Sequence, residues 1–206
     1  MRTKKRDFNQ SAKHYLDKIY DIFDAQKISE IKDLARDLKN CWTLDKQVFI
    51  CGNGGSAANA IHLANDLLYG IGACGPKPII AGIRVEALAS NSAIMTCLAN
   101  DTGYENIFSK QLEVKGNEKD LLIVLSGSGN SPNIVSALKT AKDLGMHSYA
   151  IVAFSGGYCK DLADRTIHFK VNDMQIAEDT QLIVGHICMP WLNENKPNNI
   201  GKPTNE

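Results

Sequence analysis

The chain has 206 residues, of which 44% are hydrophobic and 22% charged, and its 23 basic and 23 acidic side chains give a formal net charge of zero. This composition is that of an ordinary globular protein with one substantial core. Balanced charge argues against a nucleic-acid partner, which usually requires a basic excess or stripe. No apolar run approaches the roughly 18 residues that cross a bilayer, and no apolar segment follows the basic residues 1–7 as in a signal peptide. We therefore expect neither a nucleic acid nor a membrane as partner.

The six cysteines are scattered along the chain, and no pair has C-x-x-C spacing. Several lie inside apolar runs, as buried free thiols do. Reduced cysteines are typical of the cytoplasm, so we expect a cytoplasmic protein.

Helical periodicity and short apolar runs alternate along the chain. Two helices over residues 8–43 precede the first strand, at 46–51, and we expect them to pack on a partner subunit or across the domain. The elements expected after them are helices over 56–69 (capped by Ser56), 92–100, 105–114, 132–144 and 175–193, a loop over 70–78, and strands near 79–83, 119–126, 148–154 and 166–171. This order predicts one α/β domain over residues 1–195, with a mostly parallel sheet covered on both faces, and a flexible tail over 196–206.

Two hydroxyl-rich turns each follow an apolar run and open a helical segment. They are Cys-Gly-Asn-Gly-Gly-Ser at residues 51–56 and Ser-Gly-Ser-Gly-Asn-Ser at 126–131. A helix N-terminus offers unpaired N–H groups and a positive dipole, and glycine lets the backbone approach a ligand closely. Ligands of parallel sheets bind at the carboxyl ends of the strands, where both turns lie. The pattern predicts a phosphate site that needs neither a metal nor a lysine.

Two pairs of histidine and carboxylate have helical spacing. His62 and Asp66 are four residues apart, and Glu178 and His186 are eight apart, so the members of each pair lie roughly on one helix face. Together they could form a zinc site of two imidazoles and two carboxylates, or supply a general base and a general acid. Taken alone, His62 could equally be a helix histidine with a satisfied hydrogen bond. For Asp101, in the turn 100–103, ordinary turn chemistry also stays open.

Three segments in order resemble the sugar isomerase (SIS) family, and within it the phosphoheptose isomerases: residues 52–58, 100–104 and 126–133. The similarity runs from about residue 8 to residue 195. It implies a three-layer α/β/α sandwich around a five-stranded parallel sheet, with an N-terminal helical arm. It also implies a homotetramer with active sites at subunit interfaces, and one Zn²⁺ per subunit.

The resemblance also implies roles for single residues. The residues implied in substrate binding are Ser56, Ser126, Ser128 and Ser131 for the phosphate, Asn53 and Asp101 for the sugar chain, and Gly54 and Gly127 in the same turns. The implied zinc ligands are His62, Asp66, Glu178 and His186, with Asp66 as general base and His186 as general acid. Asp66 stands where the family has glutamate, and Glu178 where it has glutamine. A second carboxylate therefore enters the site, and two outcomes stay open: Glu178 takes over part of the catalytic role, or the activity is reduced.

The activity implied is the conversion of sedoheptulose 7-phosphate to D-glycero-D-manno-heptose 7-phosphate through an enediol, which supplies heptose for lipopolysaccharide, capsule or another glycoconjugate. Residues 78–92 depart from the family pattern, which leaves another phosphosugar open as substrate. A non-catalytic SIS protein of the kind that binds the replication initiator is the alternative from another class.

Overall fold

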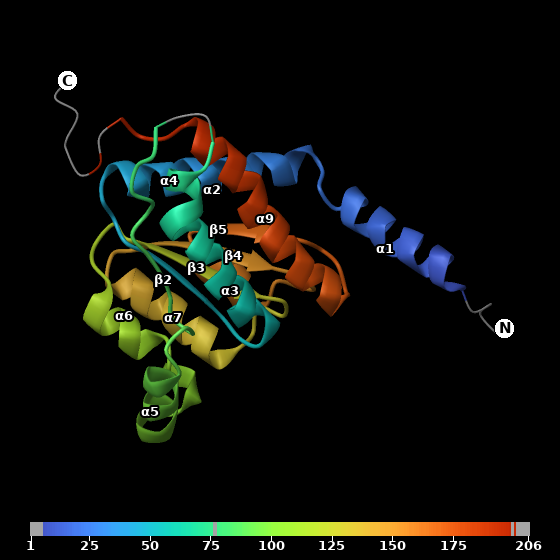
Figure 1. Cartoon of the computed structure of the whole chain (residues 1–206). Coiled ribbons are helices and arrows are strands. Elements are labelled where there is room, and N and C mark those ends of the chain that lie inside the picture. Colours follow the sequence, from blue (N-terminus) through green and yellow to red (C-terminus); the bar gives the residue numbers. More distant parts are fainter. Residues whose placement is uncertain (1–5, 76–77, 199, 201–206) are drawn as a thin grey trace.

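The computed structural model describes residues 6–75, 78–198 and 200, which form a sheet with helices on both faces (Figure 1). Five parallel strands lie in the order β2-β1-β3-β4-β5. Their bounds are β1 Val48–Gly52, β2 Val85–Ala87, β3 Leu121–Ser126, β4 His147–Val152 and β5 Arg165–His168. The predicted three-layer α/β/α sandwich is confirmed.

The helices mostly follow the predicted segments. Their bounds are α1 Phe8–Asp21, α2 Ala25–Thr43, α3 Gly55–Asn65, α4 Ile71–Ala73, α5 Ser92–Thr102, α6 Ser109–Lys115, α7 Pro132–Asp143, α8 Gly157–Leu162 and α9 Met174–Glu194, with a π-helical turn η1 at Asp66–Gly70 and a 3₁₀ turn η2 at Tyr104–Asn106. The short helix α8 was not expected from the sequence. The helix expected over 56–69 is α3 continued by η1, and it begins at Gly55.

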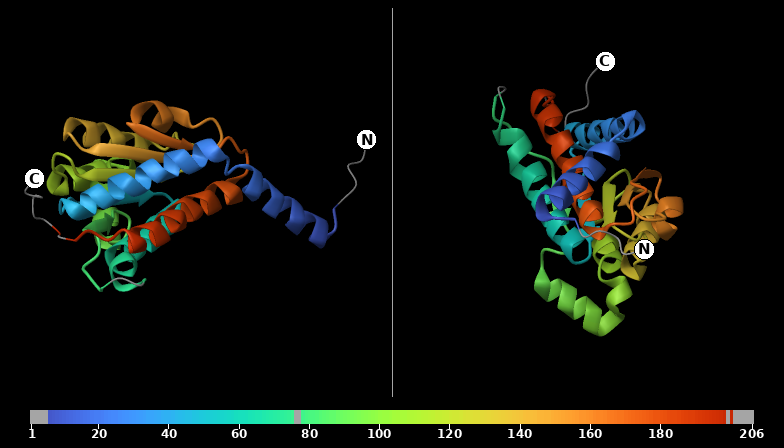
Figure 2. Two further views of the ribbon diagram at one scale, coloured as in Figure 1. Left: turned by 90° about the horizontal axis from the view of Figure 1, so that it is seen from above. Right: turned by 90° about the vertical axis from the view of Figure 1, so that its right-hand side faces the viewer.

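The core lies on both faces of the sheet, because the central strands β1 and β3 are buried along their whole length. Val48 and Ile50 of β1 pack on one face with α2, α3 and α9, whereas Phe49 and Cys51 pack on the other face with α6, α7 and α8. Continuous apolar strands of this kind are typical of parallel sheets covered by helices on both sides. The two helical layers are visible in Figure 2.

The prediction of a strand at 79–83 is wrong, since the second strand is β2 at Val85–Ala87. The apolar run instead passes along η1, where the Ile83 N–H donates to the carbonyl of Leu67 at 2.9 Å. At Gly82 an added Cβ would lie 2.0 Å from the carbonyl oxygen of Leu68. This backbone contact takes the run away from the sheet edge and requires a residue without a side chain.

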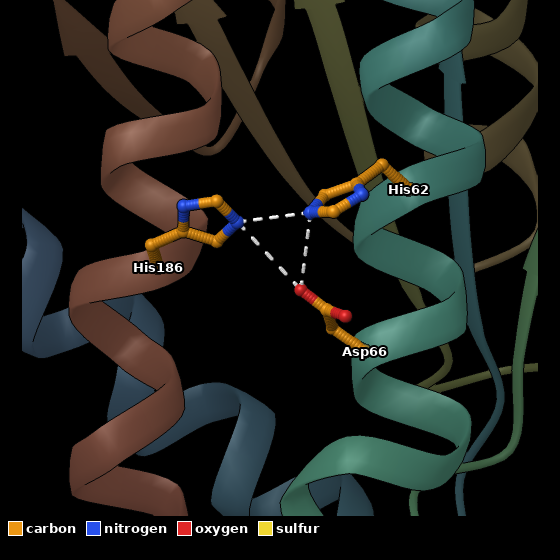
Figure 3. Close-up of side chains that lie close together, drawn as sticks. All are labelled: His62, Asp66 and His186. Atoms are coloured by element: carbon orange, nitrogen blue, oxygen red, sulfur yellow. Dashed lines mark hydrogen bonds and ion pairs between the residues drawn. The ribbon is translucent and has the colours of Figure 1, made fainter.

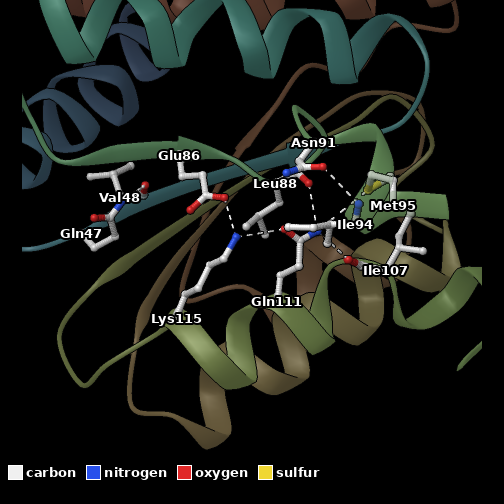
Figure 4. Close-up of polar contacts among 10 residues, drawn as sticks. All are labelled: Gln47, Val48, Glu86, Leu88, Asn91, Ile94, Met95, Ile107, Gln111 and Lys115. Carbon is white, nitrogen blue, oxygen red and sulfur yellow. Dashed lines mark hydrogen bonds and ion pairs between the residues drawn. The ribbon is translucent and has the colours of Figure 1, made fainter. Parts of the chain in front are cut away.

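Buried Gln111 of α6 holds the chain beyond β2 in place (Figure 4). Its Nε2 donates to the carbonyl of Leu88 at 2.9 Å, and Lys115 of the same helix forms an ion pair with Glu86 of β2. Asn91 then caps α5 by accepting from two backbone N–H groups. These contacts fix the start of the segment α5–η2, which projects from the sheet in Figure 1.

The N-terminal helix α1 has no buried residue and extends away from the body of the molecule (Figure 2). Among the described residues, two polar contacts tie it to the start of α9: the Tyr15 hydroxyl donates to Asp179, and Lys18 pairs at 3.2 Å with Asp173, the N-cap residue of α9. Its large apolar side chains Phe8, Leu16 and Tyr20 are exposed.

At the other end of the chain, Lys196 and Pro197 are buried, and the Lys196 ammonium donates to the carbonyl of Gly72 at 2.7 Å. Residues 199 and 201–206 of the predicted tail lie outside the described residues. Within the described part of the chain, no helix is both long and apolar enough to cross a membrane.

Candidate active site

A cavity of about 100 Å³ lies where β1 and β3 end. It is lined by Asn53, Ser56, Leu125, Ser126, Gly127, Ser128, Ser131, Met174 and Glu178. The structure therefore brings together the four serines and Asn53 that the sequence assigns to one substrate site, and Gly127 with them. Gly54 is not among the lining residues, and it lies next to the cavity at the start of α3.

The hydroxyl groups of this cavity are oriented by the backbone. Ser126 Oγ accepts from the N–H of Gly129 at 3.1 Å, and Ser128 Oγ accepts from the N–H of Asn130 at 3.2 Å. Neither hydroxyl proton has an acceptor among the described residues, so both hydroxyl groups can donate to a ligand in the cavity. This arrangement suits an anion with several acceptor oxygens.

Two of the helices that start beside the cavity, α3 and α7, have no hydrogen bond from the side chain of their N-cap residue. The N-cap residues are Gly54 for α3 and Ser131 for α7, and neither makes a side-chain hydrogen bond to its helix. The prediction that Ser56 caps α3 is wrong, because the chain turns at Gly54 with φ +56°, which favours glycine, and Ser56 falls in the first helical turn. The uncapped start of α3 leaves backbone N–H groups for an anionic ligand. At α7 the first residue is Pro132, which has no N–H, and the N–H of Ile134 already donates to Asn133 Oδ1.

A second cluster lies between α3 and α9, where two imidazoles and a carboxylate point at one another (Figure 3). His62 Nε2 lies 3.0 Å from His186 Nε2 and 3.3 Å from Asp66 Oδ2, and the distance from His186 Nε2 to Asp66 Oδ2 is 3.7 Å. The imidazole side chains are about half exposed. Residues 124 positions apart are thus joined in one polar cluster.

The spacing of the three atoms is close to that of ligands around zinc. A tetrahedral zinc ion with bonds of about 2.0–2.2 Å separates its ligand atoms by about 3.3–3.6 Å, and the observed distances lie on both sides of that range. Two imidazole nitrogens that face each other are also compatible with a cation between them, because both can then use their lone pairs. The donor set of two nitrogens and one oxygen fits zinc.

Helices α3 and α9 run side by side in the same direction, and this arrangement positions the cluster. Asn59 of α3 donates to the carbonyl oxygen of Glu178 at 2.9 Å and to the side chain of Gln181 at 3.0 Å. One turn further along α3, His62 meets His186 of α9. At Gly185 an added Cβ would lie 2.2 Å from the Leu63 Cδ2 methyl group, so a larger residue would force the Leu63 side chain to move.

Glu178 does not belong to the group of three ligand atoms. Eight residues of helix span about 12 Å, so Glu178 lies near the start of α3 while His186 lies near its end. Its carboxylate lines the serine cavity and lies against Gly55, where an added Cβ would be 2.3 Å from Oε1. The carboxylate forms no hydrogen bond or ion pair with the described residues. The ligand and catalytic roles of Glu178 stay predictions.

Asp101 is also apart from the cavity. It lies exposed in the last turn of α5, where its carboxylate accepts from Asn100 at 2.8 Å and lies 3.5 Å from the Cys97 sulfur. The Asp101 hydrogen bond and charge raise the pKa of the Cys97 thiol. A contact between Asp101 and a sugar stays a prediction.

Two residues that sequence reasoning left without a role contact the cavity residue Asn53. Tyr104 of η2 places its hydroxyl 3.0 Å from Asn53 Oδ1, and Asn133 of α7 exchanges two amide hydrogen bonds with Asn53. Both residues belong to the motif segments 100–104 and 126–133. Their place in these motif segments is the sequence signal that could have found them.

The fold and the two clusters define an SIS-domain protein, and the family model of the SIS domain matches residues 8–153. The phosphoheptose isomerase of Maridesulfovibrio salexigens is 34% identical over 169 residues, which cover 82% of this chain and 80% of that protein. The phosphoheptose isomerase of Helicobacter pylori strain P12 is 37% identical over 147 residues, covering 70% and 74%.

Solved structures of phosphoheptose isomerases have the same fold as this chain. The phosphoheptose isomerase GmhA of Neisseria gonorrhoeae has a TM-score of 0.79 at 26% identity, with 90% of this chain and 98% of that chain covered. The phosphoheptose isomerase of Francisella tularensis has a TM-score of 0.76 at 26% identity, with 93% and 100% covered. The chain belongs to the phosphoheptose isomerase family, as the resemblance of its motifs predicted.

Proposed function

We propose that this chain is an aldose–ketose isomerase that converts sedoheptulose 7-phosphate to D-glycero-D-manno-heptose 7-phosphate through an enediol. The observation that carries the proposal is the cluster of His62, Asp66 and His186 on the same helix pair that borders the serine cavity. Membership of the phosphoheptose isomerase family supports the choice of substrate. The product would supply heptose for lipopolysaccharide, capsule or another glycoconjugate.

In this proposal the serine cavity holds the phosphate. The hydroxyl groups of Ser126 and Ser128 would donate to the anion, together with the backbone N–H groups at the uncapped start of α3. The phosphate is remote from the reacting carbons of an open-chain heptose, so its binding energy positions the sugar and takes no part in the chemistry.

The proton transfers fall to the second cluster. Isomerisation moves a proton between C1 and C2, and each well-placed acid or base contributes typically a hundred- to ten-thousandfold. Asp66 takes the carbon-bound proton, and His186 serves the carbonyl and hydroxyl oxygens. The short distances between His62, His186 and Asp66 support a common reacting centre for these groups.

We assign one Zn²⁺ per subunit to His62, Asp66 and His186. We keep Glu178 as the proposed fourth ligand, which requires its carboxylate to turn from the serine cavity toward this cluster. When bound, zinc would supply Lewis-acid polarisation of the substrate oxygens.

We also propose a homotetramer with active sites at subunit interfaces. The exposed apolar side chains of α1 and the half-exposed imidazoles of the cluster support it, since both leave surface for a neighbouring subunit. A cytoplasmic location is part of the same proposal, because all six cysteines are free thiols.

The test is turnover of sedoheptulose 7-phosphate by the purified protein with Zn²⁺, followed by NMR as solvent deuterium enters the sugar at C1 and C2. We expect turnover and one zinc per chain in the wild type, and strong loss of both in His62→Ala and His186→Ala. His147→Ala removes an exposed histidine at the opposite end of the strands and is the matched control. A wild type that binds zinc without turning over any seven-carbon phosphosugar would overturn the proposal, and absence of both metal and turnover would favour the non-catalytic alternative.

A further inference from the structure

The orientation of the Asn53 side chain can be deduced from a backbone donor. The N–H of Ile134 donates to Asn133 Oδ1 at 3.0 Å, and this fixes which end of the Asn133 amide is the oxygen. The nitrogen of that amide then donates to Asn53 at 2.8 Å, so the Asn53 atom that receives it is Oδ1. In return, Asn53 Nδ2 donates to Asn133 Oδ1 at 2.9 Å.

Tyr104 reinforces the same orientation. Its hydroxyl lies 3.0 Å from Asn53 Oδ1, an atom that can only accept, so the tyrosine is the donor. Asn53 Oδ1 is therefore occupied by two donors, and one of the two Nδ2 protons is bound to Asn133. The second Nδ2 proton has no partner among the described residues, and Asn53 lines the serine cavity.

Three separate segments meet at this amide. Asn53 belongs to the turn after β1, Asn133 to the first turn of α7, and Tyr104 to η2 beyond α5. Without the tyrosine hydroxyl, the Asn53 side chain would keep only the contact with Asn133.

We propose that Tyr104 is a positioning residue that acts through Asn53: it holds the amide so that one N–H donor faces an acceptor oxygen of the sugar chain. The inference rests on the proposed phosphosugar substrate, and it adds a determinant of affinity that the metal cluster and the serines do not supply. Loss of one neutral hydrogen bond in a binding site is worth about 1 kcal/mol or slightly more, which corresponds to roughly a tenfold change in an equilibrium constant.

The experiment is a double-mutant cycle of Tyr104→Phe and Asn53→Ala with sedoheptulose 7-phosphate, measured as KM, kcat and the calorimetric Kd. We expect Tyr104→Phe to raise KM about tenfold with kcat changed much less, and to have an effect below twofold in the Asn53→Ala background. Tyr158→Phe is the matched control, because Tyr158 is similarly exposed and its hydroxyl makes no hydrogen bond among the described residues. Equal thermal unfolding midpoints establish that the variants are folded.

Wild-type KM for Tyr104→Phe, or an equal effect of that change with and without Asn53, would overturn the inference. The cycle also separates it from the proposed function. If the wild type binds sedoheptulose 7-phosphate without turning it over, the isomerase proposal fails and the Kd cycle still decides the role of Tyr104. If the wild type does not bind the sugar phosphate, both fail.

Discussion

Lengthening the carboxylate at position 66 tests whether this site is built around aspartate. Asp66→Glu restores the residue of the family pattern but adds one C–C bond of about 1.5 Å. In the structure Asp66 Oδ2 already lies 3.3 Å and 3.7 Å from the two imidazole nitrogens, at the spacing of zinc ligands. A longer side chain must therefore fold back or displace the imidazoles.

The expected loss of catalytic rate follows from that displacement. Misplacing a catalytic group by about 1 Å lowers the rate on the order of a hundredfold, which is about 2.7 kcal/mol in activation free energy. We therefore expect Asp66→Glu to lower kcat by about that factor, although glutamate also binds zinc and the metal content should stay near one per chain. On this reasoning, the length of the aspartate side chain matches the positions of the two imidazoles in this site.

The assay is kcat for sedoheptulose 7-phosphate at saturating zinc, together with bound metal per chain. Asp143→Glu makes the same chemical change at an exposed position at the end of α7 and should leave kcat unchanged. A kcat that rises in Asp66→Glu would refute the reasoning, because it would mean that aspartate leaves the carboxylate short of its working position.

Three further changes probe the turns and the core. Ser128→Ala should raise KM more than it lowers kcat, because Ser128 binds the remote phosphate; the opposite pattern would remove it from that role. Gly129→Ala should lower the free energy of unfolding by at least ~2 kcal/mol, measured in urea. The reason is that Gly129 has φ +69° and an added Cβ would lie 1.9 Å from the carbonyl oxygen of Gly156. An unchanged free energy of unfolding would show that the turn can relax. Burial raises the pKa of the Cys159 and Cys188 thiols from 9.0 to about 12. The unfolded chain thus releases these protons first, and the free energy of unfolding should fall above about pH 9, by up to ~1.4 kcal/mol per pH unit for each thiol; an unfolding free energy independent of pH between 8 and 11 would contradict this.

The sheet could be predicted because each buried strand is a short apolar run followed by a turn and a helix. The error at β2 has a physical cause: residues 79–83 have the composition of a strand, but the backbone contact of Gly82 with η1 is a tertiary interaction that no local pattern encodes. The short helix α8 lacks enough residues for a periodic signal.

The candidate site could be predicted only in part, because local spacing does not show which helices pack against each other. Spacing put His62 beside Asp66 on one helix, whereas the meeting of His62 with His186 depends on the parallel packing of α3 on α9. The contact of Tyr104 with Asn53 joins two segments 51 residues apart, and only the folded chain brings them together.

The exposed helix α1 makes the order of the N-terminus depend on protein concentration. Isolated helices of fewer than about 12–15 residues are only marginally stable in water, and α1 has 14 residues with none buried. If the proposed tetramer covers its apolar side chains, dilution below the dissociation constant removes that cover. The polar contacts of Tyr15 and Lys18 with the start of α9 then remain. Helix content should then fall as the tetramer dissociates, so that dilution alone unfolds α1.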